Sequence, residues 1–309
     1  MSVYKQRVRR LMAAILARGV PRGILTDPQF FSLWERRGLH ILRASFYSPV
    51  PVLAALNGHA NTRRETLSGI QWRDDAQRDL LNSLSPIAAA EALDLSRHVA
   101  SHCLPKGAYG GADRTTLYCL LRHIAPRRVI EVGAGVSTFI TAHALERNEQ
   151  DDGRGSVFTS IDPYPNPILT GNPVGRCRRI ARPVQDMPLD EFETLEDGDV
   201  LFIDSTHVCK VASDVNFLIL EVLPNLKPGV WVHFHDIFLP NDYPKEWIEQ
   251  THRFWNEQYL LQAFLAFNKA YQVELATNYL AHACGSDYPD IFEDDEVIEP
   301  GSFWIRKIA

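Results

Sequence analysis

The chain has 309 residues, of which 45% are hydrophobic and 23% charged, and its formal net charge is −6. This composition is typical of a globular protein, and the acidic balance argues against a general affinity for nucleic acid. No run approaches the roughly 20 apolar residues that span a bilayer, so we expect no membrane span. The five cysteines are dispersed and form no C-x-x-C pair, which favours reduced thiols in a cytoplasmic protein.

Residues 1–105 have the pattern of helices broken by turns, without a repeating strand–helix rhythm. We expect them to form an N-terminal helical extension that caps the substrate. A first helix is indicated by five apolar residues at helical spacing, and these are Tyr4, Val8, Leu11, Met12 and Ile15. A further helix is predicted over 85–104, with Ser85 as its N-cap.

From residue 106 onward the pattern alternates between short β-branched runs and helical stretches. Five strands are predicted, over 127–133, 156–162, 178–186, 198–204 and 228–236. Such alternation predicts parallel strands joined by crossover helices, and therefore an α/β domain over 106–309. A long aromatic-rich helix over 244–268 and two more strands, over 271–278 and 302–308, complete the prediction.

The turn after the first of these strands reads VIEVGAGVST and spans residues 129–138. Gly133 and Gly135 allow a sharp turn and a close approach to a ligand, and Ser137 lies at the start of the next helix. The G-x-G-x-x-G pattern of dinucleotide sites is incomplete, because Thr138 stands at the third glycine position. Glu131 precedes the turn and could meet a cationic amine. A plain tight turn without a ligand is the alternative.

Two more acids stand at the ends of the next two strands. Asp162 could accept the hydroxyls of a ribose, or it could cap a helix. Asp186 could accept the amino group of an adenine, or it could lie in a surface loop. Together with Glu131 they match the amine, ribose and adenine of S-adenosylmethionine. Tyr109, in a glycine-rich stretch, could cover this cofactor as a gate or belong to a simple linker.

The fourth and fifth strands end in FIDSTH and HFHDIF, which place Asp204, His207, His235 and Asp236 at one edge of the sheet. Here His207 is the first candidate for a general base and His235 the second, with Asp236 orienting the ring. A metal held by Asp204, His235 and Asp236 is the alternative. Asp204 and Asp236 alone suit a hydrated Mg²⁺, whereas His207, His235 and Asp236 suit Zn²⁺ or Fe²⁺ better. A purely structural role is also open.

These motifs, together with 160–165, 213–240, 243–248 and 253–265, resemble class I S-adenosylmethionine-dependent methyltransferases. More narrowly, they are similar to a bacterial subfamily with an IDSSH-like and an HDIFLP motif. The resemblance implies a Rossmann-like, seven-stranded, mostly parallel sheet with helices on both faces and an antiparallel last strand over 302–308. It also implies methyl transfer to an oxygen of a small molecule, such as a secondary metabolite or sugar, with histidine-assisted deprotonation.

Related methyltransferases of the catechol type bind magnesium through an aspartate after the fourth strand and a polar pair after the fifth. The matching positions here are Asp204 and the pair His235–Asp236. Two other functions are weighed: an NAD-dependent Rossmann oxidoreductase, and a non-catalytic partner protein on a degenerate methyltransferase fold. The sequence is compatible with a homo-oligomer and does not name the acceptor.

Overall fold

The computed structural model describes residues 21–42, 44–45, 47–56, 67–102, 109–164, 168–171, 174–284 and 299–309, and also Arg7, Val8, Met12 and Gly19. The chain divides into two compact units, Met1–His59 and Ala60–Ala309, and each is described by itself. The predicted helix over residues 4–15 lies almost entirely outside the described residues. In the part of the chain that is described, no helix combines the length and the apolar character needed to cross a bilayer.

The described residues of the first unit form short helices. They are α2 (Arg22–Leu25), η1 (Pro28–Phe30), α3 (Phe31–Glu35) and η2 (Leu53–Ala55). Asp27 caps η1, because its carboxylate accepts the backbone N–H of Gln29 at 3.0 Å. The role of this region as a substrate cap stays a prediction.

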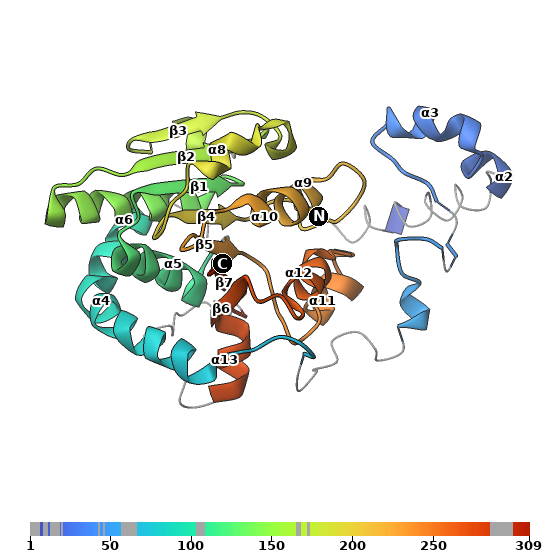
Figure 1. The fold of residues 1–309 in the computed structure, drawn as a ribbon. Coiled ribbons are helices and arrows are strands. Elements are labelled where there is room, and N and C mark those ends of the chain that lie inside the picture. Colours follow the sequence, from blue (N-terminus) through green and yellow to red (C-terminus); the bar gives the residue numbers. More distant parts are fainter. Residues whose placement is uncertain are drawn as a thin grey trace. The chain divides into compact units, whose positions relative to one another are not determined.

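The second unit is built on a seven-stranded sheet with the strand order β3-β2-β1-β4-β5-β7-β6 (Figure 1). The strands are β1 (Arg128–Val132), β2 (Val157–Ile161), β3 (Cys177–Ile180), β4 (Val200–Ile203), β5 (Trp231–Phe234), β6 (Tyr271–Ala276) and β7 (Phe303–Lys307). The first five pair in parallel, and β7 lies antiparallel between β5 and β6. The predicted Rossmann-like sheet, with its antiparallel last strand, is confirmed.

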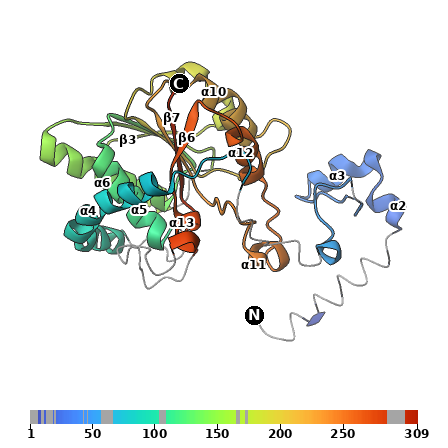
Figure 2. The ribbon, with the colours of Figure 1, turned by 60° about the horizontal axis from the view of Figure 1, so that its bottom comes forward.

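Helices cover both faces of this sheet (Figures 1 and 2). One face carries α4 (Asp74–Ser101), α5 (Gly111–Ile124) and α6 (Val136–Asp152). The other carries the helical run α9 (Asp214–Phe217), η4 (Leu218–Val222) and α10 (Leu223–Asn225), with α12 (Glu257–Leu265) beside it. The remaining elements are α7 (Ile168–Gly171), η3 (Val184–Asp186), α8 (Leu189–Glu193), α11 (Lys245–Glu249) and α13 (Thr277–Cys284).

Successive residues of a strand point to opposite faces of the sheet and belong to two separate hydrophobic cores. Val200 and Phe202 of β4 pack under α4, α5 and α6, while Leu201 and Ile203 face the opposite core. All four are at most 1% exposed, so the strand is buried on both faces. This explains why it reads as a continuous apolar run.

Two predicted helix boundaries are wrong. The helix α4 starts at Asp74, eleven residues before the predicted N-cap, and continues through Pro86. Ser85 lies inside it and donates its hydroxyl to the carbonyl of Leu81 at 3.2 Å. The predicted helix over 244–268 is instead α11 and α12, separated by a loop over residues 250–256.

The helix α4 packs against α5, α6 and β6, and so belongs to the same compact unit as the sheet. The division near residue 59 therefore differs from the predicted boundary near residue 105. Leu84 of α4 is fully buried in this packing, whereas Leu93 of the same helix is 63% exposed.

We expect Leu84→Ala to lower the free energy of unfolding by about 2–5 kcal/mol, because it leaves a cavity between α4 and the sheet. The matched variant Leu93→Ala should cost less than about 0.5 kcal/mol. Chemical denaturation followed by circular dichroism measures both. Equal effects of the two substitutions would contradict the packing of α4 on the sheet.

Candidate functional site

The turn between β1 and α6 depends on the glycine at position 133. Gly133 has a φ of +88°, and a Cβ placed on it would lie 1.8 Å from the carbonyl oxygen of Asp204. Its N–H also donates to the carbonyl of Ile161 at the end of β2. Only glycine allows the ends of β1 and β4 to approach so closely.

Glu131 lies beneath this turn and not in the open site. It is fully buried, and its two carboxylate oxygens accept the hydroxyls of Ser137 and Thr138, each at 2.8 Å. Burial raises the pKa of Glu131 to about 7, against the hydrogen bonds from Ser160, Thr138 and Ser137 that lower it. The carboxylate therefore ties the start of α6 to β1, and a direct contact with an amine stays a prediction.

Asp162 fixes the far side of the turn. Its carboxylate accepts the backbone N–H of Ala134 at 2.9 Å and of Tyr164 at 2.7 Å. Asp186, by contrast, is exposed at the end of η3 and does not line a hollow here; Val184 and Gln185 do. The structure thus brings Asp162 to the site and leaves Asp186 outside it.

Two hollows meet at this edge of the sheet. One has a volume of about 430 Å³ and the other about 330 Å³. The residues that line both are Gly133, Asp162, Asp204, Ser205 and Thr206. The larger hollow also contains Tyr109, Gly135, Ser137, His207, His235 and Asp236, so most predicted site residues share one cavity.

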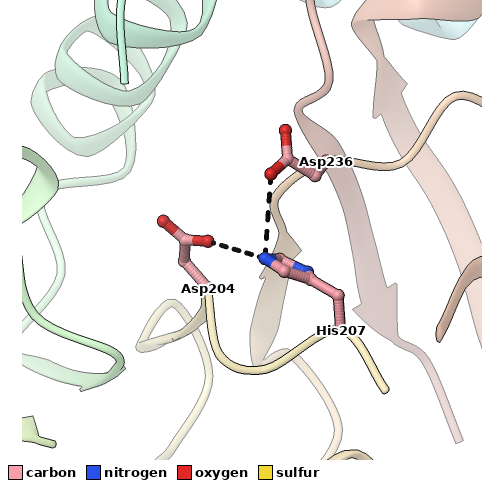
Figure 3. Close-up of side chains that lie close together, drawn as sticks. All are labelled: Asp204, His207 and Asp236. Carbon is pink, nitrogen blue, oxygen red and sulfur yellow. Dashed lines mark ion pairs between the residues drawn. The ribbon is translucent and has the colours of Figure 1, made fainter. Parts of the chain in front are cut away.

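His207 is the centre of a compact polar cluster at the wall of the larger hollow (Figure 3). Its Nε2 lies 3.3 Å from Oδ1 of Asp204 and 3.7 Å from Oδ2 of Asp236. On the other side of the ring, Nδ1 lies 2.9 Å from Oε2 of Glu257, which is 1% exposed. The imidazole is therefore held between one buried carboxylate and two that face the cavity.

His235 lies beside the same two aspartates. Its Nδ1 is 3.4 Å from Asp204 and 3.5 Å from Asp236, and its Nε2 is 3.5 Å from Asp113. The Asp113 carboxylate also accepts the backbone N–H groups of Gly301 and Ser302, each at 2.9 Å. His235 is thus anchored to α5 and to the start of β7, whereas His233 is fully buried in the sheet.

The carboxylates stabilise both imidazolium rings. Although burial opposes it, Asp204 and Glu257 raise the pKa of His207 to about 10. The pKa of His235 is likewise raised against burial, by the charges of Asp236 and Asp204. Burial raises the pKa of Asp236, whereas the two histidines hold the pKa of Asp204 below its usual value despite its burial.

Three residues that line the cavity adopt left-handed backbone conformations. The φ angles are +59° at Tyr109, +59° at His207 and +57° at Asp236. Each costs about 1 kcal/mol for a residue with a side chain, and such strain gathers where a side chain must point at a site. At Asp236, the backbone of Gly301 comes close enough that a Cβ on Gly301 would lie 3.0 Å from its Cα.

Sequence reasoning missed Glu257 and Asp113. Glu257 stands in the aromatic stretch that was predicted as one continuous helix, and nothing in its spacing indicates a contact 50 residues away. Asp113 lies in the first turn of α5, where an acid is ordinarily explained by the helix dipole. Only the folded chain shows that each holds a histidine.

Known proteins resemble this chain in sequence and in structure. Residues 130–237 match the family model described as a methyltransferase domain. An uncharacterized protein of Archaeoglobus fulgidus is 30% identical over 163 residues, which make up 50% of this chain and 72% of that protein.

Two solved O-methyltransferases are more distant. TomG from Streptomyces achromogenes, in complex with SAM, is 15% identical over 70% of this chain and 88% of its own, with a TM-score of 0.38. An O-methyltransferase from Bacillus cereus, in complex with SAH, is 13% identical over 71% of this chain and 91% of its own, with a TM-score of 0.37. Likenesses this weak do not bear on the reaction.

The matched segment runs from β1 to the residues that follow β5, and so contains the glycine turn and the polar cluster. Residues 130–237 therefore form a methyltransferase domain, and the sheet around them has the fold of the class I S-adenosylmethionine-dependent methyltransferases. This match favours a methyltransferase over the NAD-dependent oxidoreductase that the sequence also allowed.

The residues at the two hollows fit S-adenosylmethionine. Gly135 has open space where a side chain would stand, and the two hollows share the residues Gly133, Asp162, Asp204, Ser205 and Thr206. Ser205, which lines both hollows, has a buried Oγ without a hydrogen-bond partner among the residues that the structure describes. An unpaired buried hydroxyl is costly unless a ligand satisfies it.

We expect Gly133→Ala to lower the free energy of unfolding by about 3 kcal/mol, because the methyl group meets the Asp204 carbonyl in a left-handed backbone. Gly198 has a φ of +82° and open space around it, so Gly198→Ala carries the backbone cost alone, about 1 kcal/mol. Thermal unfolding compares the two variants. The close approach of β1 and β4 would be refuted by equal losses.

Proposed function

We propose that the chain transfers the methyl group of S-adenosylmethionine to a hydroxyl oxygen of a small-molecule acceptor. The motif resemblance points to a secondary metabolite or a sugar. The observation that carries the proposal is the polar cluster of Asp204, His207 and Asp236, which shares a cavity with the glycine turn. A hydroxyl must lose its proton as the methyl group arrives. The cluster can accept that proton on a carboxylate or stabilise the negative charge that develops on the oxygen.

The carboxylates of Asp204 and Glu257 raise the pKa of His207, which disfavours this residue as the general base. With a pKa of about 10, its ring carries a proton at neutral pH and cannot accept a second one. In this state Nε2 can instead donate to an oxygen in the cavity, while Glu257 fixes the orientation of the ring through Nδ1. Proton uptake would then fall to the carboxylates of Asp204 and Asp236.

The donor set also fits a divalent cation. One ligand atom from each of Asp204, His207 and Asp236 lies within 4.8 Å of the others. Glu257, behind the imidazole, is the kind of partner that orients a metal-binding histidine. Two carboxylates and one imidazole suit Mn²⁺, Fe²⁺ or Zn²⁺ and also a hydrated Mg²⁺. A cation held there would act as a Lewis acid and lower the pKa of the acceptor hydroxyl.

Most of the acceleration would come from positioning. The nucleophilic oxygen, the methyl carbon and the sulfur must lie in line, so that the new C–O bond forms as the C–S bond breaks. Trp255 lies against the His207 ring with a centroid distance of 4.2 Å, and together with Trp247 it walls the cavity. These indole rings exclude water from the acceptor side.

We expect His207→Asn to lower kcat by about 10²- to 10⁴-fold while leaving the affinity for S-adenosylhomocysteine unchanged. Transfer of a labelled methyl group to a panel of hydroxylated acceptors, together with calorimetric titration of the product, measures both quantities. His123→Asn, at an exposed histidine of α5 outside the cavity, is the control. A variant with wild-type kcat would contradict the role of the cluster.

Removal of divalent cations tests how the cluster works. We expect a chelator to abolish turnover without unfolding the protein, and added Mg²⁺, Mn²⁺ or Zn²⁺ to restore it. Glu257→Gln should raise the cation concentration needed for half-maximal activity by about 10- to 100-fold, because the His207 ring loses its orienting carboxylate. Full turnover in protein shown to be free of metal would rule out the cation and leave the carboxylates as the proton acceptors.

A further inference from the structure

The loop between α11 and α12 places one arginine at the cavity. The guanidinium carbon of Arg253 lies 4.9 Å from the ring of Trp247 and 5.2 Å from the ring of Trp255. The two indoles meet edge to face at 5.1 Å, so the cation lies against both. Such cation–π contacts hold a guanidinium in place without using its N–H donors on a carboxylate.

The charge of Arg253 is available to a ligand only where no carboxylate pairs with it. Among the residues that the structure describes, no carboxylate lies within ion-pairing distance of its guanidinium. Arg306 gives the contrast, because it too lies over an indole, that of Trp231 at 5.5 Å, but pairs with Asp197 at 2.9 Å. Arg253 is exposed and lines the cavity, where it is the sole arginine or lysine of the described lining.

The position of Arg253 is fixed relative to the reacting groups. Trp255 contacts both the His207 imidazole and the Arg253 guanidinium, so one indole links the arginine to the polar cluster. The loop is also tied to the segment that carries His207: the N–H groups of Asn256 and Glu257 donate to the His207 carbonyl at 3.1 and 3.2 Å. At its other end, the Arg253 N–H donates to the Trp247 carbonyl at 2.8 Å.

We propose that Arg253 binds an anionic group of the methyl acceptor, a carboxylate or a phosphate, while the hydroxyl to be methylated lies at the Asp204–His207–Asp236 cluster. The inference rests on the proposed function and adds the class of acceptor: a small hydroxylated molecule whose anionic group reaches Arg253 while its reactive oxygen lies at the cluster. An arginine held by aromatic faces gives two parallel N–H donors to either anion. Arg253 is the one arginine or lysine of the described lining, so an anion held there also sets the orientation of the acceptor.

The test is calorimetric titration of three matched probes into the S-adenosylhomocysteine-loaded protein. They are 4-hydroxybenzoate, 4-hydroxyphenyl phosphate and the neutral 4-hydroxybenzamide. We expect at least one anionic probe to bind about tenfold or more tightly than the amide, and the two anions tell carboxylate from phosphate recognition. The Arg253→Gln variant should bind the anionic probe no more tightly than the amide, and its affinity for the amide should equal that of the wild type. The control Arg306→Gln should still prefer the anionic probe.

The outcomes separate this inference from the proposed function. Equal affinities of the wild type for all three probes, or a preference that survives in Arg253→Gln, would overturn the role of Arg253. A loss of S-adenosylhomocysteine affinity in Arg253→Gln would also overturn it, because the arginine would then hold the carboxylate of the cofactor. Failure of the wild type itself to bind S-adenosylhomocysteine would instead refute the proposed function.

Discussion

The site depends on the parallel pairing of β4 with β1 on one side and with β5 on the other. This pairing brings the ends of three strands together, and the close contact between Gly133 and the Asp204 carbonyl closes the gap between the first two. The loop after β4 then carries His207, and the loop after β5 carries Asp236, into the same cavity. Backbone pairing between the strands therefore positions the polar side chains of the site. This explains how residues far apart in the sequence come to lie in one cavity.

The second constraint is electrostatic. Asp204 and Asp236, together with Asp113 and Glu257, surround the imidazoles of His207 and His235. Four carboxylates at so small a site are stable only with compensating positive charge, whether from two protonated rings or from a cation. The same balance of charge affects the reaction, because a change of charge on the acceptor oxygen would shift the pKa values of all groups in the cluster.

Much of this could be predicted from the sequence. Parallel strands read as short apolar runs because both faces are covered, so the five parallel strands and the acids at their ends were recognisable. The clustering of Asp204, His207, His235 and Asp236 followed from the rule that ligands bind at the carboxyl ends of such strands. Local pattern could not supply contacts made by distant elements, and Glu257 and Asp113 were invisible for that reason.

The errors have equally specific causes. Ser85 before Pro86 imitates a helix start, yet the packing of Leu81 and Leu84 against the sheet carries α4 through the proline. The aromatic residues of 244–268 imitate one amphipathic helix, whereas tertiary hydrogen bonds from Asn256 and Glu257 to the His207 carbonyl break it. The loop at that break brings Arg253 and Trp255 to the cavity, and the helical pattern of the sequence gave no sign of it.

The most direct test of the central claim is a crystal structure of the protein with S-adenosylhomocysteine, in which the anomalous signal locates the sulfur. We expect the sulfur beside the Gly133 turn, facing the Asp204–His207–Asp236 cluster, with room between them for a methyl group and an acceptor oxygen. A cofactor bound elsewhere, or one whose sulfur points away from His207 and its two aspartates, would contradict the account.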